Sequence, residues 1–170
     1  MAIHPIRIFP DAVLSRPCEP VQDFGADLQR LIRDLVDTLN ASPGVGLAAP
    51  QIGISKRVSV IDASRRKLRK GERPFKHHGL LVIVNPSLVR GWGVQVPREG
   101  CLSVPDLLAN VERHQSVRVC AQGAGGNPVE IQSEGFEALA LQHEIDHLEG
   151  RLFLDRVENI KTDIFRRKIS

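Results

Sequence analysis

The sequence lacks a long uncharged apolar run, and nothing in it approaches the roughly 20 residues that a membrane-spanning helix needs. The first residues also lack the basic start and the apolar stretch of a secretory signal peptide. Cysteine is scarce, and an odd total of three points to free thiols or metal ligands rather than to a disulfide framework. These absences argue against membrane and secreted proteins, so the expected location is the cytoplasm.

The composition is that of an ordinary globular protein. Hydrophobic residues make up 42% of the 170 residues, which argues against disorder, and this length suits one domain spanning residues 1–170. No internal repeat or linker interrupts it. The net charge of +3 permits weak attraction to an RNA-rich surface without establishing it, and no specific DNA binding is expected.

An amphipathic helix is predicted near the N-terminus. Apolar residues recur at helical spacing from Leu28 to Leu39, with charged residues between them, and the segment 40–44 ends the pattern. Several prolines exclude a long helix before residue 23. These apolar residues from Leu28 to Leu39 form a leucine stripe along the helix, and the stripe is interpreted as part of the core.

Most of the remaining segments have the patterns of strands. The predicted strands are residues 57–62, 80–84, 88–97, 116–120 and 129–132. The basic segment 63–79 is interpreted as a solvated loop, with a phosphate-binding patch as the alternative. Residues 151–155 should be extended, and residues 159–170 should form a short C-terminal helix. The predicted fold class is therefore α+β, with mostly antiparallel sheets packed around a central helix at 134–148.

The strongest chemical signal is His-Glu-x-x-His, within Gln142 to Leu148. Residues four apart share a helix face, so His143 and His147 can bind one metal ion, and Glu144 lies close enough to move a proton on metal-bound water. A catalytic metal usually takes a third protein ligand. The candidates are His4, Cys18, His77, His78, Cys101, His114 and Cys120. Cys101 is favoured because it lies in a glycine-bounded turn, where its sulfur can point freely.

A second unusual stretch runs from Gly44 to Gln51 and consists mainly of small, uncharged residues. Such residues let a backbone approach a ligand closely. A dinucleotide-binding fingerprint is disfavoured because the stretch follows a helix and runs into Pro50. Gln51 is its long polar side chain and therefore a candidate hydrogen-bond donor.

Three motifs, in this order, resemble the signature motifs of the peptide deformylases. They are Gly44-Val45-Gly46-Leu47-Ala48-Ala49-Pro50-Gln51, Glu99-Gly100-Cys101-Leu102-Ser103 and Gln142-His143-Glu144-Ile145-Asp146-His147-Leu148. The resemblance implies a metal-dependent hydrolase that removes the N-formyl group from the initiator methionine of nascent polypeptides and releases formate. It implies Cys101, His143 and His147 as ligands of one divalent metal ion. That ion is expected to be Fe²⁺ natively, and Zn²⁺, Ni²⁺ or Co²⁺ can occupy the same ligands.

The resemblance also assigns roles to other residues. In the implied mechanism a metal-bound hydroxide attacks the formyl carbon, with Glu144 as general base and then general acid. The Gln51 side chain and the Leu102 backbone N–H are the expected donors to the oxyanion. The expected substrate contacts are backbone pairing at Val45, Gly46, Glu99 and Gly100. The candidates for a methionine pocket are Phe136, Leu139 and Ala140, because they lie about one helical turn before His143.

Two other functions compete with this one. A zinc endopeptidase would share the His-Glu-x-x-His helix but would use a His or Glu as its third ligand. A non-catalytic, metal-stabilised module that binds ribosomes or RNA would use the basic segments. The basic residues near the C-terminus are interpreted as a solvated helix face, with a ribosome contact near the exit tunnel as the alternative: Lys161, Arg166, Arg167 and Lys168.

Overall fold

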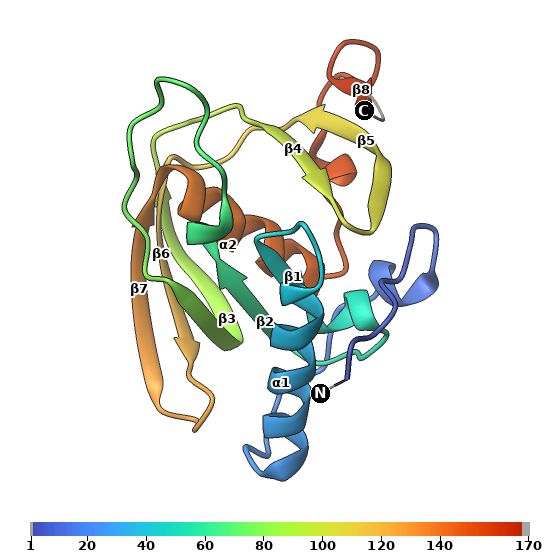
Figure 1. Cartoon of the computed structure of the whole chain (residues 1–170), viewed down its shortest axis with the longest axis vertical. Coiled ribbons are helices and arrows are strands. Elements are labelled where there is room, and N and C mark those ends of the chain that lie inside the picture. The colour runs from blue at the N-terminus through green and yellow to red at the C-terminus, as the bar shows by residue number, and fades with distance from the viewer. Residues whose placement is uncertain (1, 168–170) are drawn as a thin grey trace.

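The computed structural model describes residues 2–167, and its elements confirm the predicted α+β class (Figure 1). The helices are α1 (Ala26–Asn40) and α2 (Gly135–Leu148). A five-stranded antiparallel sheet has the order β1 (Gly46–Ala48), β2 (Val58–Asp62), β3 (Leu80–Trp92), β6 (Ser116–Gln122) and β7 (Pro128–Glu134). A three-stranded antiparallel sheet has the order β4 (Arg98–Cys101), β5 (Val104–Asn110) and β8 (Ile164–Arg166). Short 3₁₀ helices lie at Ala12–Ser15, Ala49–Ile52, Ala63–Arg65 and Phe153–Arg156.

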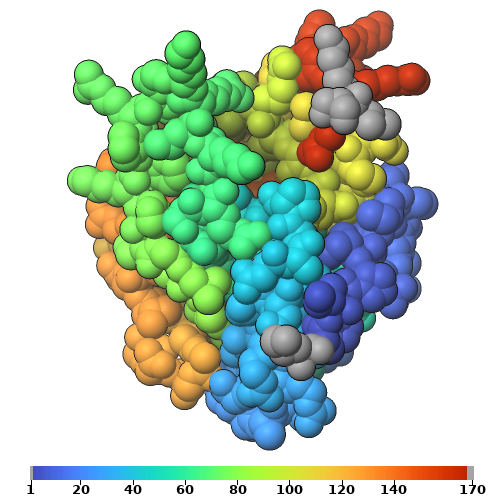
Figure 2. All heavy atoms as spheres, viewed as in Figure 1, coloured from blue at the N-terminus to red at the C-terminus, as the bar shows by residue number. Residues whose placement is uncertain are grey.

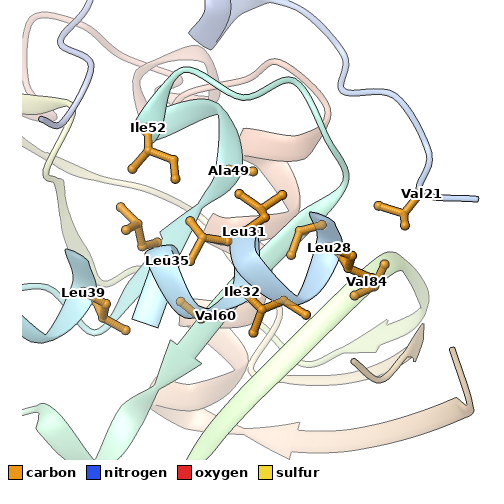
Figure 3. Packing of buried hydrophobic residues seen from close by; sticks show 12 residues of the cluster. Val21, Leu28, Leu31, Ile32, Leu35, Leu39, Ala49, Ile52, Val60 and Val84 are labelled. Atoms are coloured by element: carbon orange, nitrogen blue, oxygen red, sulfur yellow. The ribbon is translucent and has the colours of Figure 1, made fainter. Parts of the chain in front are cut away.

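Helix α1 packs on one face of the five-stranded sheet, as its leucine stripe predicts. Leu28, Leu31 and Leu35 are buried with Val58 and Val60 of β2 in one cluster (Figure 3). Because successive side chains of a strand point to opposite faces, β2 can serve two layers. Each fully buried leucine contributes about 1.5–3 kcal/mol to folding.

Helix α2 packs on the opposite face of the same sheet, so that sheet is covered on both sides. Ile61 of β2 joins the second cluster, which also contains Leu141 and Ile145 of α2. Figure 1 shows α2 with the five-stranded sheet on one side and β4 and β5 on the other. A third cluster holds Cys101 and Phe153 beneath the three-stranded sheet. The helix with the two metal-ligand candidates therefore lies between the layers.

The C-terminal end of α2 depends on Gly150. Its φ is +72°, in the region that favours glycine, and a Cβ there would lie 2.6 Å from the carbonyl carbon of Arg16. The chain can therefore turn sharply after His147 and return along the core through Phe153. Neither helix in residues 2–167 has the length and the apolar character needed to cross a membrane.

The prediction of two separate strands at 80–84 and 88–97 is wrong at Asn85-Pro86, which lies between them. Strand β3 continues through these residues as a single element, with a shift of its register against β6 between Val84 and Ser87. Asn85 has a φ of +49°, and its side chain accepts a hydrogen bond from Val21 N and donates one to Val21 O, both at 2.8 Å. The Asn-Pro pair thus makes a bulge that anchors the N-terminal segment.

The predictions for the C-terminal part are also wrong. Residues 164–166 form strand β8, which pairs with β5, and Phe153–Arg156 is a 3₁₀ helix rather than extended chain. A few apolar residues in a short segment fit both the helical period and the strand period, so they do not distinguish a helix from a strand. The open edge of β5 offers a partner for Phe165. Residues 168–170 of the predicted helix lie outside the described residues. Strands β1, β4 and β5 were not predicted.

Candidate active site

The three predicted metal ligands come together in the structure. One ligand atom each from Cys101, His143 and His147 lies within 4.8 Å of the others. Cys101 Sγ is 3.2 Å from His147 Nε2, and a tetrahedral ion with ordinary Zn–S and Zn–N bond lengths would place two such atoms about 3.6 Å apart. The donor set and its spacing therefore fit a divalent transition metal. Among residues 2–167 this is the only such group of potential ligands, so the other candidate histidines and cysteines lie elsewhere.

Local structure explains why these atoms meet. The two histidines lie one turn apart on α2, with ring centroids 5.0 Å apart. Cys101 is the last residue of β4, at the tight connection to β5. The N–H of Ser103 lies 3.4 Å from Cys101 Sγ, which helps to aim the sulfur at the helix. Cys101 and His147 are both buried.

The electrostatics favour the form of Cys101 that binds a metal. Burial raises the pKa of the thiol, but the charge of His147 and the hydrogen bonds with His143 and His147 outweigh this effect. The pKa of Cys101 is therefore well below its usual value. Because the thiolate is the metal-binding form, the site is prepared for a cation.

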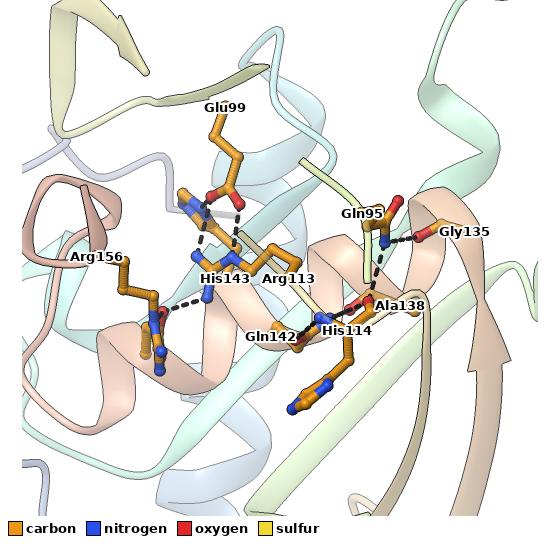
Figure 4. A network of polar contacts seen from close by, with 10 residues as sticks. Gln95, Glu99, Arg113, His114, Gly135, Ala138, Gln142, His143 and Arg156 are labelled. Atoms are coloured by element: carbon orange, nitrogen blue, oxygen red, sulfur yellow. Dashed lines mark hydrogen bonds and ion pairs between the residues drawn. The ribbon is translucent and has the colours of Figure 1, made fainter. Parts of the chain in front are cut away.

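Glu99 holds His143 in place with its side chain, a role that the sequence reasoning missed. Its Oε2 accepts a hydrogen bond from His143 Nδ1 at 2.9 Å, which leaves Nε2 of that ring free to bind a metal (Figure 4). Arg113 donates to the same carboxylate at 2.6 and 3.0 Å. Burial raises the pKa of Glu99, but these hydrogen bonds outweigh it and bring the pKa to about 2.

The network continues away from the metal centre. Arg113 also donates to Asp146 at 2.6 Å, and Asp146 accepts two hydrogen bonds from Arg156, each at 2.6 Å. Glu99, Arg113 and Asp146 are all buried. Each of these buried charges has a partner of opposite sign, as stability requires. The network thus fixes β4 to α2 from behind the site. Only the position of Glu99, two residues before Cys101, could have suggested its role from the sequence.

Glu144 lies in the same pocket and is buried. Its Oε2 accepts a hydrogen bond from Ser59 Oγ at 3.4 Å. Burial raises the pKa of Glu144, and the nearby His143 and His147 only partly oppose this. A Cβ on Gly46 would lie 2.8 Å from Cδ of Glu144, so glycine at 46 lets β1 pass directly over the carboxylate. Ser59 was not foreseen.

Gln51 is held firmly beside the sulfur. Its Oε1 accepts a hydrogen bond from Ala48 N at 3.0 Å, and its Nε2 donates to Ser103 Oγ at 3.1 Å. The same Nε2 lies 3.6 Å from Cys101 Sγ. Sulfur is a weak acceptor, so a stronger acceptor can take this second hydrogen.

A pocket of about 280 Å³ opens onto these groups. Its wall includes all the predicted catalytic and substrate-binding residues: Gln51, Leu102, Glu144, Val45, Gly46, Glu99, Gly100, Phe136, Leu139 and Ala140. Cys101 and His143 also line it, whereas the buried His147 does not. The sequence reasoning missed four lining residues: Pro43, Gly44, Arg98 and Arg167.

The pocket lies between two sheet edges. β1 pairs only with β2, and β4 pairs only with β5, so each strand has one side without a partner strand among the described residues. Figure 2 shows the opening between the green residues of segment 63–79, the cyan residues around β1 and the yellow residues of β4 and β5. An extended peptide could therefore pair with backbone on either side of it.

Comparison with known proteins decides the family. A sequence model described as polypeptide deformylase matches residues 3–163. The chain belongs to the peptide deformylase family. A peptide deformylase of Syntrophobacter fumaroxidans is 44% identical over 168 residues, covering 99% of this chain and 94% of the relative.

Solved peptide deformylases agree in fold. The structure from Legionella pneumophila has a TM-score of 0.83 and 44% identity, covering 94% of this chain and 89% of that one. The structure from Thermotoga maritima has a TM-score of 0.83 and 35% identity, covering 94% of this chain and 100% of that one.

The family fixes the general activity. The chain is a hydrolase that removes the N-formyl group from the initiator methionine of nascent polypeptides and releases formate. The zinc endopeptidase and the non-catalytic RNA-binding module are not favoured.

Proposed function

We propose that this deformylase works with a divalent metal ion held by Cys101, His143 and His147, with Glu144 as the group that moves protons. The observation that carries the proposal is the convergence of the three ligand atoms at the base of a pocket that Glu144 also lines. The ion would polarise the formyl group and lower the pKa of water at the site. We expect Fe²⁺ natively from the family resemblance. Zn²⁺, Ni²⁺ or Co²⁺ can substitute for it, because the Cys and His donors suit all four ions.

Glu144 acts first as a base and then as an acid. Its carboxylate takes a proton from the attacking water and later delivers it to the leaving amine of the methionine. Burial raises the pKa of Glu144, which brings the carboxyl group closer to the range where it can both take up and release a proton. Such a group contributes about 10²–10⁴-fold to the rate.

The oxyanion receives hydrogen bonds from Gln51 Nε2 and from the backbone N–H of Leu102. Gln51 is positioned in advance by Ala48 and Ser103, so it needs little rearrangement when charge develops on the formyl oxygen. Removing one such donor typically lowers the rate by about 10²–10³-fold. The proposal therefore predicts that Gln51→Ala retains metal and loses turnover.

The substrate binds as an extended strand between β1 and β4. The backbone of Val45 and Gly46 pairs with one side of the peptide, and the backbone of Glu99 and Gly100 with the other. Backbone pairing does not read side chains, which suits an enzyme that accepts many different nascent chains. The methionine side chain packs against the part of the pocket wall formed by Phe136, Leu139 and Ala140.

A ribosome contact near the exit tunnel would bring the enzyme to its substrate in the cytoplasm. The segment 63–79 beside the opening carries exposed Lys67, Arg69, Lys70 and Arg73, which could meet rRNA phosphates. Replacing all four by glutamine should weaken co-sedimentation with ribosomes and leave hydrolysis of short peptides intact. Unchanged co-sedimentation would exclude this segment as the contact.

We also propose that residues 1–170 form one catalytic domain.

The test is formate release from formyl-Met-Ala-Ser by protein prepared anaerobically with Fe²⁺. Glu144→Gln should keep the metal and lose about 10²–10⁴-fold in turnover. Cys101→Ala should lose the metal. Glu158→Gln, which replaces an exposed glutamate away from the pocket, is the matched control and should behave as wild type. Full turnover by Glu144→Gln would contradict the proposed role.

A further inference from the structure

Two arginines at the mouth of the pocket have no role in the mechanism. Arg98 and Arg167 both line the pocket and are exposed. Within residues 2–167 neither guanidinium takes part in an ion pair. The other charged side chains of the lining are Glu99, His143 and Glu144, which are occupied at the metal centre. Arg98 Nε donates a hydrogen bond to the neutral Asn110 Oδ1 at 3.5 Å. The mouth therefore carries two positive charges that have no acidic partner in the described part of the chain.

The three-stranded sheet carries both guanidinium groups on one face, with that of Arg98 over Phe165 of β8 and that of Arg167 beside Gly100 of β4. Gly100 of β4 pairs with Leu108 of β5, which pairs with Phe165 of β8. Arg98 precedes Gly100 by two residues and Arg167 follows Phe165 by two, so both should share the face of that row. The contacts agree: Arg98 Cζ is 3.9 Å from the Phe165 ring centroid, and a Cβ on Gly100 would clash with Arg167 Nη2.

The sheet itself offers no acid that neutralises this pair. Asp106 of β5 accepts a hydrogen bond from the backbone N–H of Arg167 at 2.8 Å through its carbonyl oxygen. Its carboxylate forms no ion pair with Arg167 or with Arg98. Arg66, on the other side of the pocket over Phe136, differs because it is paired with Glu72 at 2.6 Å. Arg98 and Arg167 are thus available to an anion.

We propose that Arg98 and Arg167 bind a carboxylate carried by the third residue of the formyl peptide; this rests on the proposed mode of substrate binding. Arg98 lies three residues before Cys101 on β4, which corresponds to about 10 Å along a strand. An extended substrate whose formyl group lies at the metal centre covers the same length in three residues. The carboxylate is either an Asp or Glu side chain or the terminal carboxylate of a formylated tripeptide.

The experiment compares four peptides on the metal-loaded enzyme. Formyl-Met-Ala-Glu-amide and formyl-Met-Ala-Gln-amide differ only in the charge of the third side chain, and the acid and amide of formyl-Met-Ala-Ala differ only in the terminal charge. At least one charged peptide should have a kcat/KM about two- to fivefold above its neutral partner, through a lower KM. The two pairs distinguish the two sources of the carboxylate. Added salt should reduce the advantage, because the arginines are exposed.

Variants assign the effect to the two arginines. Arg98→Gln and Arg167→Gln should each bring the ratio of charged to neutral peptide toward one. This ratio is measured on one preparation, so the fraction of active enzyme cancels. Arg90→Gln is the matched control, because Arg90 is an exposed arginine on β3 that does not line the pocket. It should leave the ratio unchanged.

The possible outcomes are distinct. Equal kcat/KM for charged and neutral peptides in both pairs, with formate released, would overturn the inference and leave the proposed function standing. An equal loss of the ratio in Arg90→Gln would also overturn it, because the effect would then come from overall charge. Absence of formate release from all four peptides would contradict the proposed function itself and this inference with it.

Discussion

Replacing Glu99 by glutamine should weaken metal binding through a residue that is not itself a ligand. The carboxylate accepts three hydrogen bonds, from His143 Nδ1 at 2.9 Å and from Arg113 at 2.6 and 3.0 Å. Glutamine has similar size but only one acceptor oxygen. If that oxygen takes the position of Oε2 and keeps the bond to His143, the amide group faces Nε of Arg113, donor against donor.

The magnitude follows from these contacts. A buried donor left without an acceptor costs about 1–3 kcal/mol, so the free energy of unfolding should fall by roughly that amount. The uncharged oxygen is also a weaker partner for His143 than a carboxylate. Loss of such an outer partner typically lowers metal affinity about 10–100-fold. Because Glu99→Gln can retain one hydrogen bond to His143, we expect a loss near the lower end, about tenfold.

Asp146→Asn separates the effect on stability from the effect on metal affinity. Asp146 accepts from the same Arg113 at 2.6 Å, but it makes no hydrogen bond to His143. This variant should lose a similar amount of stability and keep its metal affinity. Metal affinity is measured by competition with a chelator, and stability by urea unfolding of the metal-free protein, since bound metal adds to apparent stability. Equal metal affinities in the two variants would refute the role assigned to Glu99.

Three further predictions concern the pocket and the thiols. Gly46→Ala places a methyl group 2.8 Å from Cδ of Glu144, so it should lower kcat by about 10²-fold with metal content unchanged, as assayed by formate release and metal analysis. Phe75→Ala removes a ring whose centroid lies 5.6 Å from that of Phe136, a pocket-wall residue, so the KM for formyl-Met peptides should rise about two- to tenfold while kcat stays close to wild type. Cys120 is half-buried whereas the other two cysteines are buried, so a thiol reagent should modify one cysteine rapidly in the native metal-loaded protein, and peptide mapping should identify Cys120. Rapid modification of a second cysteine in the native metal-loaded protein would contradict this last prediction.

The features that could be predicted from the sequence are those that depend on residues close together in the chain. The leucine stripe predicted α1, because a helix repeats its apolar face every three to four residues. The spacing of His143 and His147 predicted a shared face of α2. The spacing of the histidines left seven candidates for the third ligand. The glycine-bounded turn favoured Cys101 among them, and the family resemblance implied the same residue.

The features that could not be predicted depend on contacts between distant segments. Glu99 and His143 are 44 residues apart in the chain, and their hydrogen bond exists only because the three-stranded sheet packs on α2. Strand β8 forms because β5 offers an edge, and the local pattern around Phe165 carried no sign of that partner. Arg167 lines the pocket for the same reason. Such residues become visible only when the packing is known.

The most direct test of the metal site is X-ray absorption spectroscopy of the anaerobically prepared, iron-loaded and active enzyme. One sulfur and two imidazole nitrogens should surround the iron in wild type. Cys101→Ser should remove the sulfur contribution and sharply reduce formate release. An active wild-type enzyme whose iron has only nitrogen and oxygen ligands would contradict the account.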